Sequence, residues 1–209
     1  MALGDPYLER MTVIPSGAET LEGLYHSGRR PPACVVAPPH PQLGGSMDAI
    51  VCAQLSWAVT RAEHAALRFN YRGVGASTGQ AQGDLTDVQD LRAAVDSLAD
   101  TVAGAPIALV GYSFGAYLSA NLATVDERIS HCVLVAPPTS MFEFNFDSIV
   151  DRGVSLTALL AQHDQYCPVA AASAAVIDAG GRAHVIVDDD HFFSARLSDV
   201  GRLTVEALG

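Results

Sequence analysis

The residues best suited to chemistry are a serine held between two glycines. Residues 111–115 read Gly-Tyr-Ser-Phe-Gly; they follow an apolar run at 107–110 and precede a segment with helical periodicity. Between a strand and a helix, this pattern is typical of a nucleophile elbow, a sharp turn that exposes the serine above a sheet. A serine hydroxyl is a weak nucleophile until a base removes its proton. Ser113 as nucleophile therefore requires a histidine and an acid elsewhere in the chain.

A histidine base is expected after Ser113, because folds that carry such a nucleophile elbow have their catalytic residues in the chain order nucleophile, acid, base. Three of the seven histidines, His163, His184 and His191, follow Ser113 near the end of a late apolar run. His184 opens the predicted strand 183–187, whereas His191 follows that strand on a loop. Catalytic groups gather at the carboxyl ends of strands in open α/β sheets. We therefore predict His191 as the general base.

The acid of the set is predicted to be Asp164, which follows the predicted strand 156–161 and precedes a helix opened by Pro168. An alternative role for Asp164 is that of a helix-capping or turn aspartate. The aspartates at 188–190 are too close in sequence to His191 to reach its far nitrogen. We interpret Asp190 as a residue that shapes the loop or a solvated charge.

An acyl-transfer reaction also needs donors for the oxyanion of its tetrahedral intermediate. The amide of Phe114, at the start of a helix, is one candidate. The second should come from residues 38–45, Pro-Pro-His-Pro-Gln-Leu-Gly-Gly, where three prolines have no N–H. This points to the amide of His40, with Gln42 next, although the loop could also be purely structural. Predicted substrate contacts are Gln42, Leu43, Tyr112 and Phe142.

Short apolar runs alternate with segments of helical periodicity along the chain. This pattern predicts an α/β fold, a mostly parallel central sheet with helices on both faces. Stretches 11–14 and 21–25 could form an antiparallel hairpin at one edge. Predicted strands are 33–37, 65–70, 107–110, 132–136, 156–161 and 183–187; predicted helices begin after Ser46 and after Asp84 and span 114–123, 169–179 and 194–208.

The stretch 137–153 is too short for a multi-helix cap, so we expect no large cap domain and an open, shallow site. Phe142, Phe144 and Phe146 alternate within this stretch. They could rim the site, or they could form a short strand packed on the body of the protein.

Composition limits the function classes. At 209 residues the chain is predicted to be a single domain, 1–209. With 12 basic and 23 acidic residues the net charge is −11, which argues against nucleic acid or an anionic membrane as partner. The four cysteines form no C-x-x-C pair, and the glycines at 73–79 do not match a dinucleotide-binding loop. We expect no metal, no cofactor, a small-molecule partner and, without a signal peptide or apolar span, a cytoplasmic location.

Four motifs together resemble those of the small, lidless α/β-hydrolases related to dienelactone hydrolases and prolyl oligopeptidase catalytic domains. They are residues 38–45, 68–75 (Arg-Phe-Asn-Tyr-Arg-Gly-Val-Gly), 111–115 and 190–193 (Asp-His-Phe-Phe). The resemblance implies the α/β-hydrolase fold, a triad of Ser113, Asp164 and His191, and oxyanion amides at Phe114 and near His40. The family's usual His-Gly-Asp lead-in to the acid is replaced by Ala-Gln-His-Asp at 161–164.

The predicted function is hydrolysis of small-molecule carboxylic esters through an acyl-enzyme on Ser113, without a metal. Dienelactone hydrolases proper carry cysteine at the elbow and haloalkane dehalogenases carry aspartate, so a serine there disfavours both activities. Thioesterase or peptidase activity on the same triad remains an alternative, as does a non-hydrolytic protein that binds a small molecule.

Overall fold

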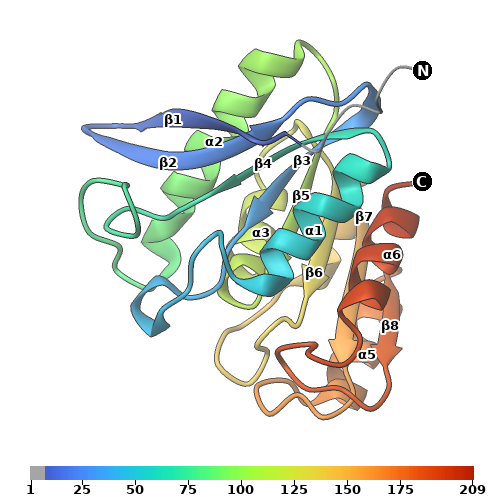
Figure 1. Cartoon of the computed structure of the whole chain (residues 1–209). Helices are drawn as coiled ribbons and strands as arrows, with labels where there is room; N and C mark the ends of the chain where they lie inside the picture. Colours follow the sequence, from blue (N-terminus) through green and yellow to red (C-terminus); the bar gives the residue numbers. More distant parts are fainter. Residues whose placement is uncertain (1–7) are drawn as a thin grey trace.

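A computed structural model of the chain, which describes residues 8–209, is built around one eight-stranded sheet (Figure 1). The strand order is β1-β2-β4-β3-β5-β6-β7-β8. The first two strands form an antiparallel hairpin, and β2 also runs antiparallel to β4. All other neighbours are parallel. The strands are β1 (Arg10–Ser16), β2 (Glu19–His26), β3 (Arg30–Ala37), β4 (His64–Phe69), β5 (Ile107–Tyr112), β6 (Ile129–Val135), β7 (Ser155–Ala161) and β8 (Arg182–Ile186).

The predicted α/β fold is confirmed, and the edge hairpin forms as expected. Every residue of β4 and β5 is buried, because helices cover both faces of a parallel sheet and its strands become continuous apolar runs. Edge strand β1 instead alternates, with Ile14 fully buried and Met11 80% exposed. Burial on both faces explains why the sequences of the central strands are unbroken apolar runs, whereas burial on one face gives β1 its alternation.

Helices pack in two layers against this sheet (Figure 1). Helices α1 and α6 cover one face, where Leu55 and Val200 pack with Val36 of β3. Helices α2, α3 and α5 cover the other face, where Leu91 and Leu118 join Val35 in the core. Neighbouring residues of one strand thus serve opposite faces. The helices are α1 (Ile50–Arg61), α2 (Val88–Val102), α3 (Phe114–Ala123), α4 (Phe146–Val150), α5 (Val169–Asp178) and α6 (Leu197–Leu208), with short 3₁₀ helices η1 (Pro41–Leu43) and η2 (Leu85–Asp87).

Two predicted helix starts require correction. Ser46 does not open α1, which begins at Ile50; the Ser46 hydroxyl accepts from the amide of Asp48 in a preceding turn. The last helix begins at Leu197 rather than 194, because the Asp190–Phe193 turn and its neighbours form a compact loop first. Asp84 does cap a helical segment, since its carboxylate accepts from Thr86 N, but that segment is η2 and α2 follows at Val88.

The stretch 137–153 contains only the short helix α4, and the strand interpretation of its phenylalanines is wrong. No strand can add there because β6 is already flanked by β5 and β7. The Asn145 side chain accepts from Ser148 N and so opens α4. Within residues 8–209 no cap domain covers the sheet, and none of the helices has the length and apolarity needed to cross a bilayer.

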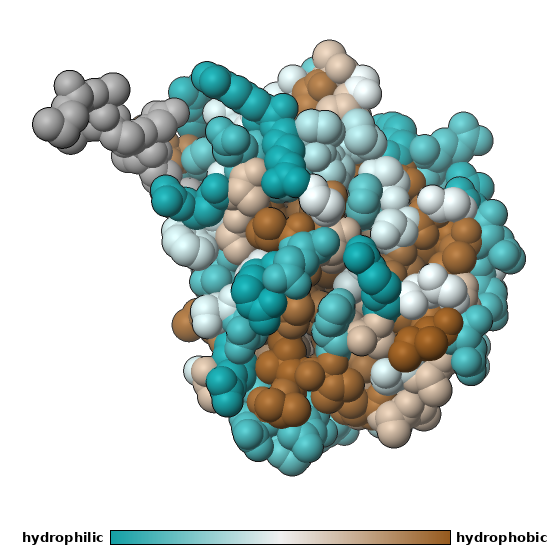
Figure 2. Space-filling model, turned by 90° about the vertical axis from the view of Figure 1, so that its right-hand side faces the viewer, coloured by the Kyte–Doolittle hydropathy of each residue, from teal (hydrophilic) through white to brown (hydrophobic). Residues whose placement is uncertain are grey.

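One end of the molecule gathers apolar side chains. Figure 2 shows them in the lower part of one face, whereas polar side chains predominate above. The parallel strands of Figure 1 run toward this lower end. Their carboxyl ends, where the candidate site lies, therefore open onto an apolar surface.

Candidate active site

The elbow between β5 and α3 holds Ser113 in a strained backbone conformation, with φ 55° and ψ −117°. Its amide donates to Val135 O at 2.9 Å, which fixes the turn to β6. A Cβ on Gly111 would lie 2.3 Å from Gly115 O, and a Cβ on Gly115 would lie 2.2 Å from Ala37 O. Only glycine allows the start of α3 to pack this closely on β5 and β3. The strain is of the kind found at functional sites.

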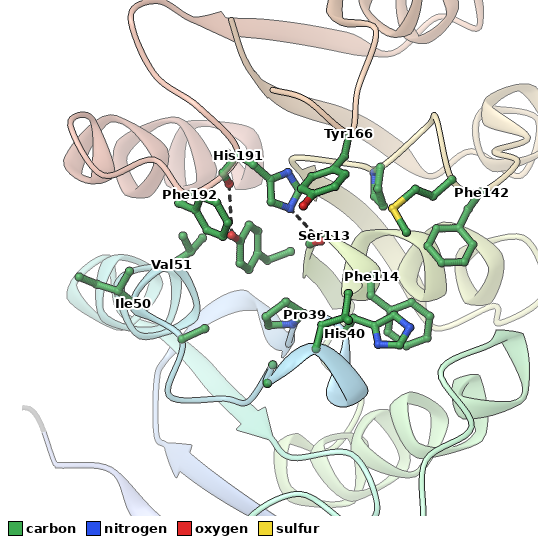
Figure 3. Close-up of a pocket in the computed structure, with 17 residues that line it drawn as sticks. Pro39, His40, Ile50, Val51, Ser113, Phe114, Phe142, Tyr166, His191 and Phe192 are labelled. Atoms are coloured by element: carbon green, nitrogen blue, oxygen red, sulfur yellow. Dashed lines mark hydrogen bonds between the residues drawn. The ribbon is translucent and has the colours of Figure 1, made fainter. Parts of the chain in front are cut away.

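Ser113, His191 and Asp164 form a continuous hydrogen-bonded chain, of which Figure 3 shows the bond between Ser113 and His191. His191 Nε2 lies 2.9 Å from Ser113 Oγ, and His191 Nδ1 lies 2.8 Å from Asp164 Oδ2. A carboxylate only accepts, so Nδ1 carries the proton and Nε2 is left to accept from the serine hydroxyl. The side chains of His191 and Asp164 are 5% and 0% exposed. Shielding from water strengthens both hydrogen bonds.

Asp164 is held in place by its own turn after β7. Its second oxygen accepts from Tyr166 N at 2.8 Å, and its amide donates to Ala161 O. The turn role considered from the sequence is therefore real, and it coexists with the bond to His191. One oxygen organises the turn while the other orients the imidazole.

The loop that carries His191 is tied together by two neighbouring aspartates. The buried Asp189 carboxylate accepts from the amides of Asp190 at 3.0 Å and Arg196 at 2.7 Å, which closes the loop on itself. The Asp190 carboxylate accepts from Phe192 N, in agreement with a loop-shaping role. This role of Asp189 was not predicted, although the run of three aspartates before His191 is a signal in the sequence.

Aromatic rings surround the imidazole. Tyr166 and Phe192 meet it edge to face, with ring centroids 4.8 and 5.6 Å away. The Tyr112 ring is tilted by 33° to the imidazole, with centroids 5.6 Å apart, and its hydroxyl donates to the backbone O of His191 at 3.2 Å. Burial raises the pKa of the Tyr112 hydroxyl well above its usual value, so it remains a donor at neutral pH. These contacts leave the imidazole little freedom to rotate.

Opposite His191 lies the segment 38–45, called the oxyanion loop below after the role predicted for it from the sequence (Figure 3). His40 and Phe114 both line the cavity beside Ser113, and their rings pack with centroids 4.7 Å apart. The amide of Phe114 is the first of α3, so no earlier turn of that helix can accept from it. Within residues 8–209 we find no acceptor for this amide or for that of His40.

Three of the four predicted substrate contacts, Leu43, Tyr112 and Phe142, line the cavity, and Gln42 does not. The Gln42 side chain turns away, and its Nε2 donates to the carbonyls of Ala81 at 3.2 Å and Gln82 at 2.9 Å. The prediction for Gln42 is therefore wrong. The side-chain amide of Gln42 is bound by backbone carbonyls that lie about forty residues further along the chain.

Of the three phenylalanines at 142–146, only Phe142 rims the cavity. Its ring stacks on Tyr117, with centroids 4.3 Å apart and planes inclined by 16°. Phe144 and Phe146 stack on each other beside a separate surface cavity. The rim interpretation thus holds for one residue of the three.

The cavity beside Ser113 has a volume of about 480 Å³ and a mainly apolar lining. Exposed apolar side chains surround its mouth, and within the described chain no Asp, Glu, Lys or Arg side chain lines it. Figure 3 places Ile50, Val51 and Phe192 on one side of Ser113 and Phe142 on the other. The site is open, as expected without a cap, and suits uncharged groups on both sides of the serine.

Comparison with known proteins gives the family. A family model described as "Alpha/beta hydrolase family" matches residues 44–206. The chain is 31% identical over 132 residues to an uncharacterized protein of Rickettsia prowazekii (strain Madrid E). That match covers 60% of the chain and 56% of the relative, so the chain spans little more than half the length of this curated relative.

Solved structures agree in fold over nearly the whole chain. An alpha-beta serine hydrolase homologue from Coxiella burnetii superposes with a TM-score of 0.82 at 26% identity, covering 96% of this chain and 97% of that one. A serine hydrolase without a lid from Xanthomonas campestris gives a TM-score of 0.79 at 23% identity, covering 97% and 94%. The family match and the Coxiella burnetii homologue support a hydrolase function, and the chain belongs to the alpha/beta hydrolase family.

Proposed function

We propose that the protein is a serine hydrolase that cleaves carboxylic esters through an acyl-enzyme on Ser113. The observation that carries the proposal is the chain of two hydrogen bonds, 2.9 Å from Ser113 to His191 and 2.8 Å from His191 to Asp164. Because Nδ1 of His191 carries the imidazole proton, Nε2 is the nitrogen that accepts the proton of Ser113. Asp164 orients the imidazole and stabilises the imidazolium once it forms.

In the first half of the reaction, His191 Nε2 takes the proton of Ser113 as Oγ attacks the acyl carbon. Collapse of the tetrahedral intermediate breaks the bond to the alcohol oxygen, and His191 returns its proton to that leaving group. In the second half, His191 deprotonates a water, which attacks the acyl-enzyme and releases the acid. The serine regains its proton from His191, which completes the cycle.

The negative oxygen of each tetrahedral intermediate would be bound by the amides of Phe114 and His40. Both residues line the cavity beside Ser113, and neither amide has another acceptor within residues 8–209. One such donor contributes about 3 to 4 kcal/mol to transition-state stabilisation. This assignment needs no metal and no cofactor.

The substrate class follows from the cavity. Its lining is mainly apolar and carries no Asp, Glu, Lys or Arg side chain within residues 8–209. A small, uncharged ester with apolar acyl and alcohol groups suits this lining better than an anionic or peptide-like substrate, whose polar groups would be left without partners. Thioesters remain the closest rival, because their acyl chemistry is the same.

A fluorophosphonate probe tests the mechanism directly, since it reacts covalently only with an activated serine. We expect the wild-type protein to be labelled and Ser113→Ala to remain unlabelled at equal thermal stability. Equal labelling of the two proteins, or a well-folded wild type that takes up no label, would contradict the proposal. An intact ligand recovered from saturable binding to the unlabelled protein would favour the non-hydrolytic alternative.

A substrate panel then tests the bond that is cleaved. Nitrophenyl esters, acyl-thioesters and peptide amides with matched acyl groups should be hydrolysed in that order of kcat/KM. Turnover confined to the thioesters or the amides would overturn the ester assignment and leave the triad in place.

A further inference from the structure

We propose that Asp87 is a positioning residue for the oxyanion loop, acting through residues 81–83 and the His40 side chain. This inference rests on the proposed function, in which the His40 amide binds the oxyanion. Asp87 lies outside the cavity, at the end of η2, and touches none of the reacting groups. It acts on the site through a chain of hydrogen bonds.

The Asp87 carboxylate is fully buried and binds two consecutive amides. Its Oδ1 accepts from Gln82 N at 3.0 Å, and its Oδ2 accepts from Gly83 N at 2.8 Å. The carboxylate also lies at the amino end of α2, where the helix dipole favours a negative charge. Two charge-assisted bonds of this kind fix the path of the 81–83 segment.

The carbonyls of the same segment hold the oxyanion loop. Gly83 O accepts from His40 Nε2 at 3.2 Å, while Ala81 O and Gln82 O accept from Gln42 Nε2. The peptide groups at 82 and 83 therefore connect Asp87 on one side with the oxyanion loop on the other. Moving this segment would release both side-chain anchors of the loop at once.

Gly83 is the point of closest approach between the two segments. It has a φ of 75°, and a Cβ placed on it would lie 2.6 Å from His40 Cε1 and 3.0 Å from Gln42 Oε1. Glycine is thus required both for the conformation and for the space. The 81–83 segment is therefore packed directly against the oxyanion loop at Gly83.

Within the oxyanion loop, His40 is the residue on which the other bonds converge. Its O accepts from the amides of Leu43 and Gly45, and its ring packs on Phe114. The ring atom Nδ1 is buried and has no hydrogen-bond partner within residues 8–209, so the bond from Nε2 to Gly83 O is the one that fixes the ring. Fixing this ring fixes the direction of the His40 amide.

An oxyanion donor strengthens its bond only as the tetrahedral intermediate forms, so loosening it lowers kcat and leaves KM nearly unchanged. We expect Asp87→Asn to reduce kcat by about 10- to 100-fold, because one of its two acceptors becomes a donor that faces an amide N–H. His40→Ala should have a similar effect, since it keeps the backbone amide but removes the anchor. The double variant should be no slower than the slower single variant, because both act through one chain of bonds.

Asp126→Asn is the matched control. Asp126 is also a buried aspartate that accepts a backbone amide, that of Arg128, but it lies before β6 at the opposite end of the sheet. It should lower thermal stability, leave kcat per folded protein unchanged, and combine additively with His40→Ala. A wild-type kcat in Asp87→Asn, or an additive cycle between Asp87 and His40, would overturn the inference.

Hydrogen exchange provides a readout that does not depend on turnover. Asp87→Asn should accelerate exchange of the amides in the oxyanion loop, and Asp126→Asn should not. If the wild-type protein takes up no fluorophosphonate, the proposed function fails, and exchange still decides whether Asp87 holds the loop. Unchanged exchange in Asp87→Asn would overturn the positioning role whatever the activity.

Discussion

Two loops of the site each carry a histidine, and they use it in opposite ways. The loop between β8 and α6 presents the His191 imidazole to Ser113 at 2.9 Å. In the oxyanion loop, the His40 imidazole donates to Gly83 O, and His40 lines the cavity without a bond to Ser113. In the proposed function, His191 acts through its ring and His40 through its backbone amide. The residue type alone therefore does not reveal the role.

The two loops also differ in where their anchors come from. The Asp189 carboxylate closes the His191 loop on itself by accepting from the amides of Asp190 and Arg196, and bonds from Tyr112 and His163 tie the closed loop to the sheet. The oxyanion loop is held from a distance, by residues 81–83 and through them by Asp87. The closure by Asp189 needs only the loop's own segment of chain. The remotely anchored oxyanion loop is in place only when α2 and its preceding turn have packed.

The largest effect should separate the two histidines. His191→Ala removes the general base, so we expect kcat to fall by about 10⁴-fold or more, against about 10- to 100-fold for His40→Ala. Steady-state rates on a nitrophenyl ester measure both. His163→Ala, which alters an exposed side chain in the Asp164 turn, serves as control and should retain wild-type activity. Equal losses at His191 and His40 would abolish the distinction between ring and amide.

The local anchor of the His191 loop gives the next effect. Asp189→Asn exchanges one acceptor oxygen for a donor, so the loop loses a bond to the amide of Asp190 or Arg196 and the imidazole loses its fixed position. We expect kcat to fall about tenfold or more with a lower Tm. Asp188→Asn, an exposed neighbour in the same loop, should change neither quantity. A wild-type kcat in Asp189→Asn would show that the loop is held by packing alone.

The same contrast explains how much the sequence could predict. Ser113, Asp164 and His191 were located because each follows its own apolar strand, and strand ends are visible in a local pattern. The orientation of the Gln42 side chain was not predicted, because its partners at 81 and 82 belong to another segment, and no residue near Gln42 in the sequence indicates them. Local periodicity determines the elements, while contacts between distant segments decide where a loop side chain turns.

Boundaries were missed for a related reason. Ser46 is a residue type that often caps helices, yet α1 begins at Ile50, and Arg68 from β4 donates to Met47 O between the two. A tertiary contact thus holds residues 46–49 in a turn that propensity alone does not anticipate. The start of α3 was predicted correctly, because glycine geometry at the elbow is determined locally.

A smaller effect should distinguish the cavity wall from the anchors. Phe142→Ala removes a ring that lines the cavity without touching the bonds to Ser113, so KM for an apolar nitrophenyl ester should rise about fivefold while kcat changes little. That rise corresponds to about 1 kcal/mol of lost apolar contact. Phe144→Ala, which packs on Tyr117 outside the cavity, is the matched control. An equal rise in both variants would point to a general loss of packing.

The smallest effect concerns histidines away from the site. His64 and His131 lie near the amino ends of β4 and β6, and burial lowers the pKa of each; nearby Arg182 also lowers that of His131. Between the usual histidine pKa of about 6.5 and the lower folded values, the unfolded chain binds protons that the folded chain does not. Their contribution to stability is therefore complete above about pH 6.5 and declines as the pH falls through the folded pKa values.

His131→Gln isolates one share of this effect. Because the variant has no proton to take up at that position, its free energy of unfolding should fall less than that of the wild type between pH 8 and pH 5.5. Urea unfolding at a series of pH values measures the difference, and the range from pH 8 to pH 9, where neither state takes up a histidine proton, is the control. Parallel curves throughout would show that His131 titrates alike in both states. The pH dependence at the amino end of the sheet would then have to come from His64.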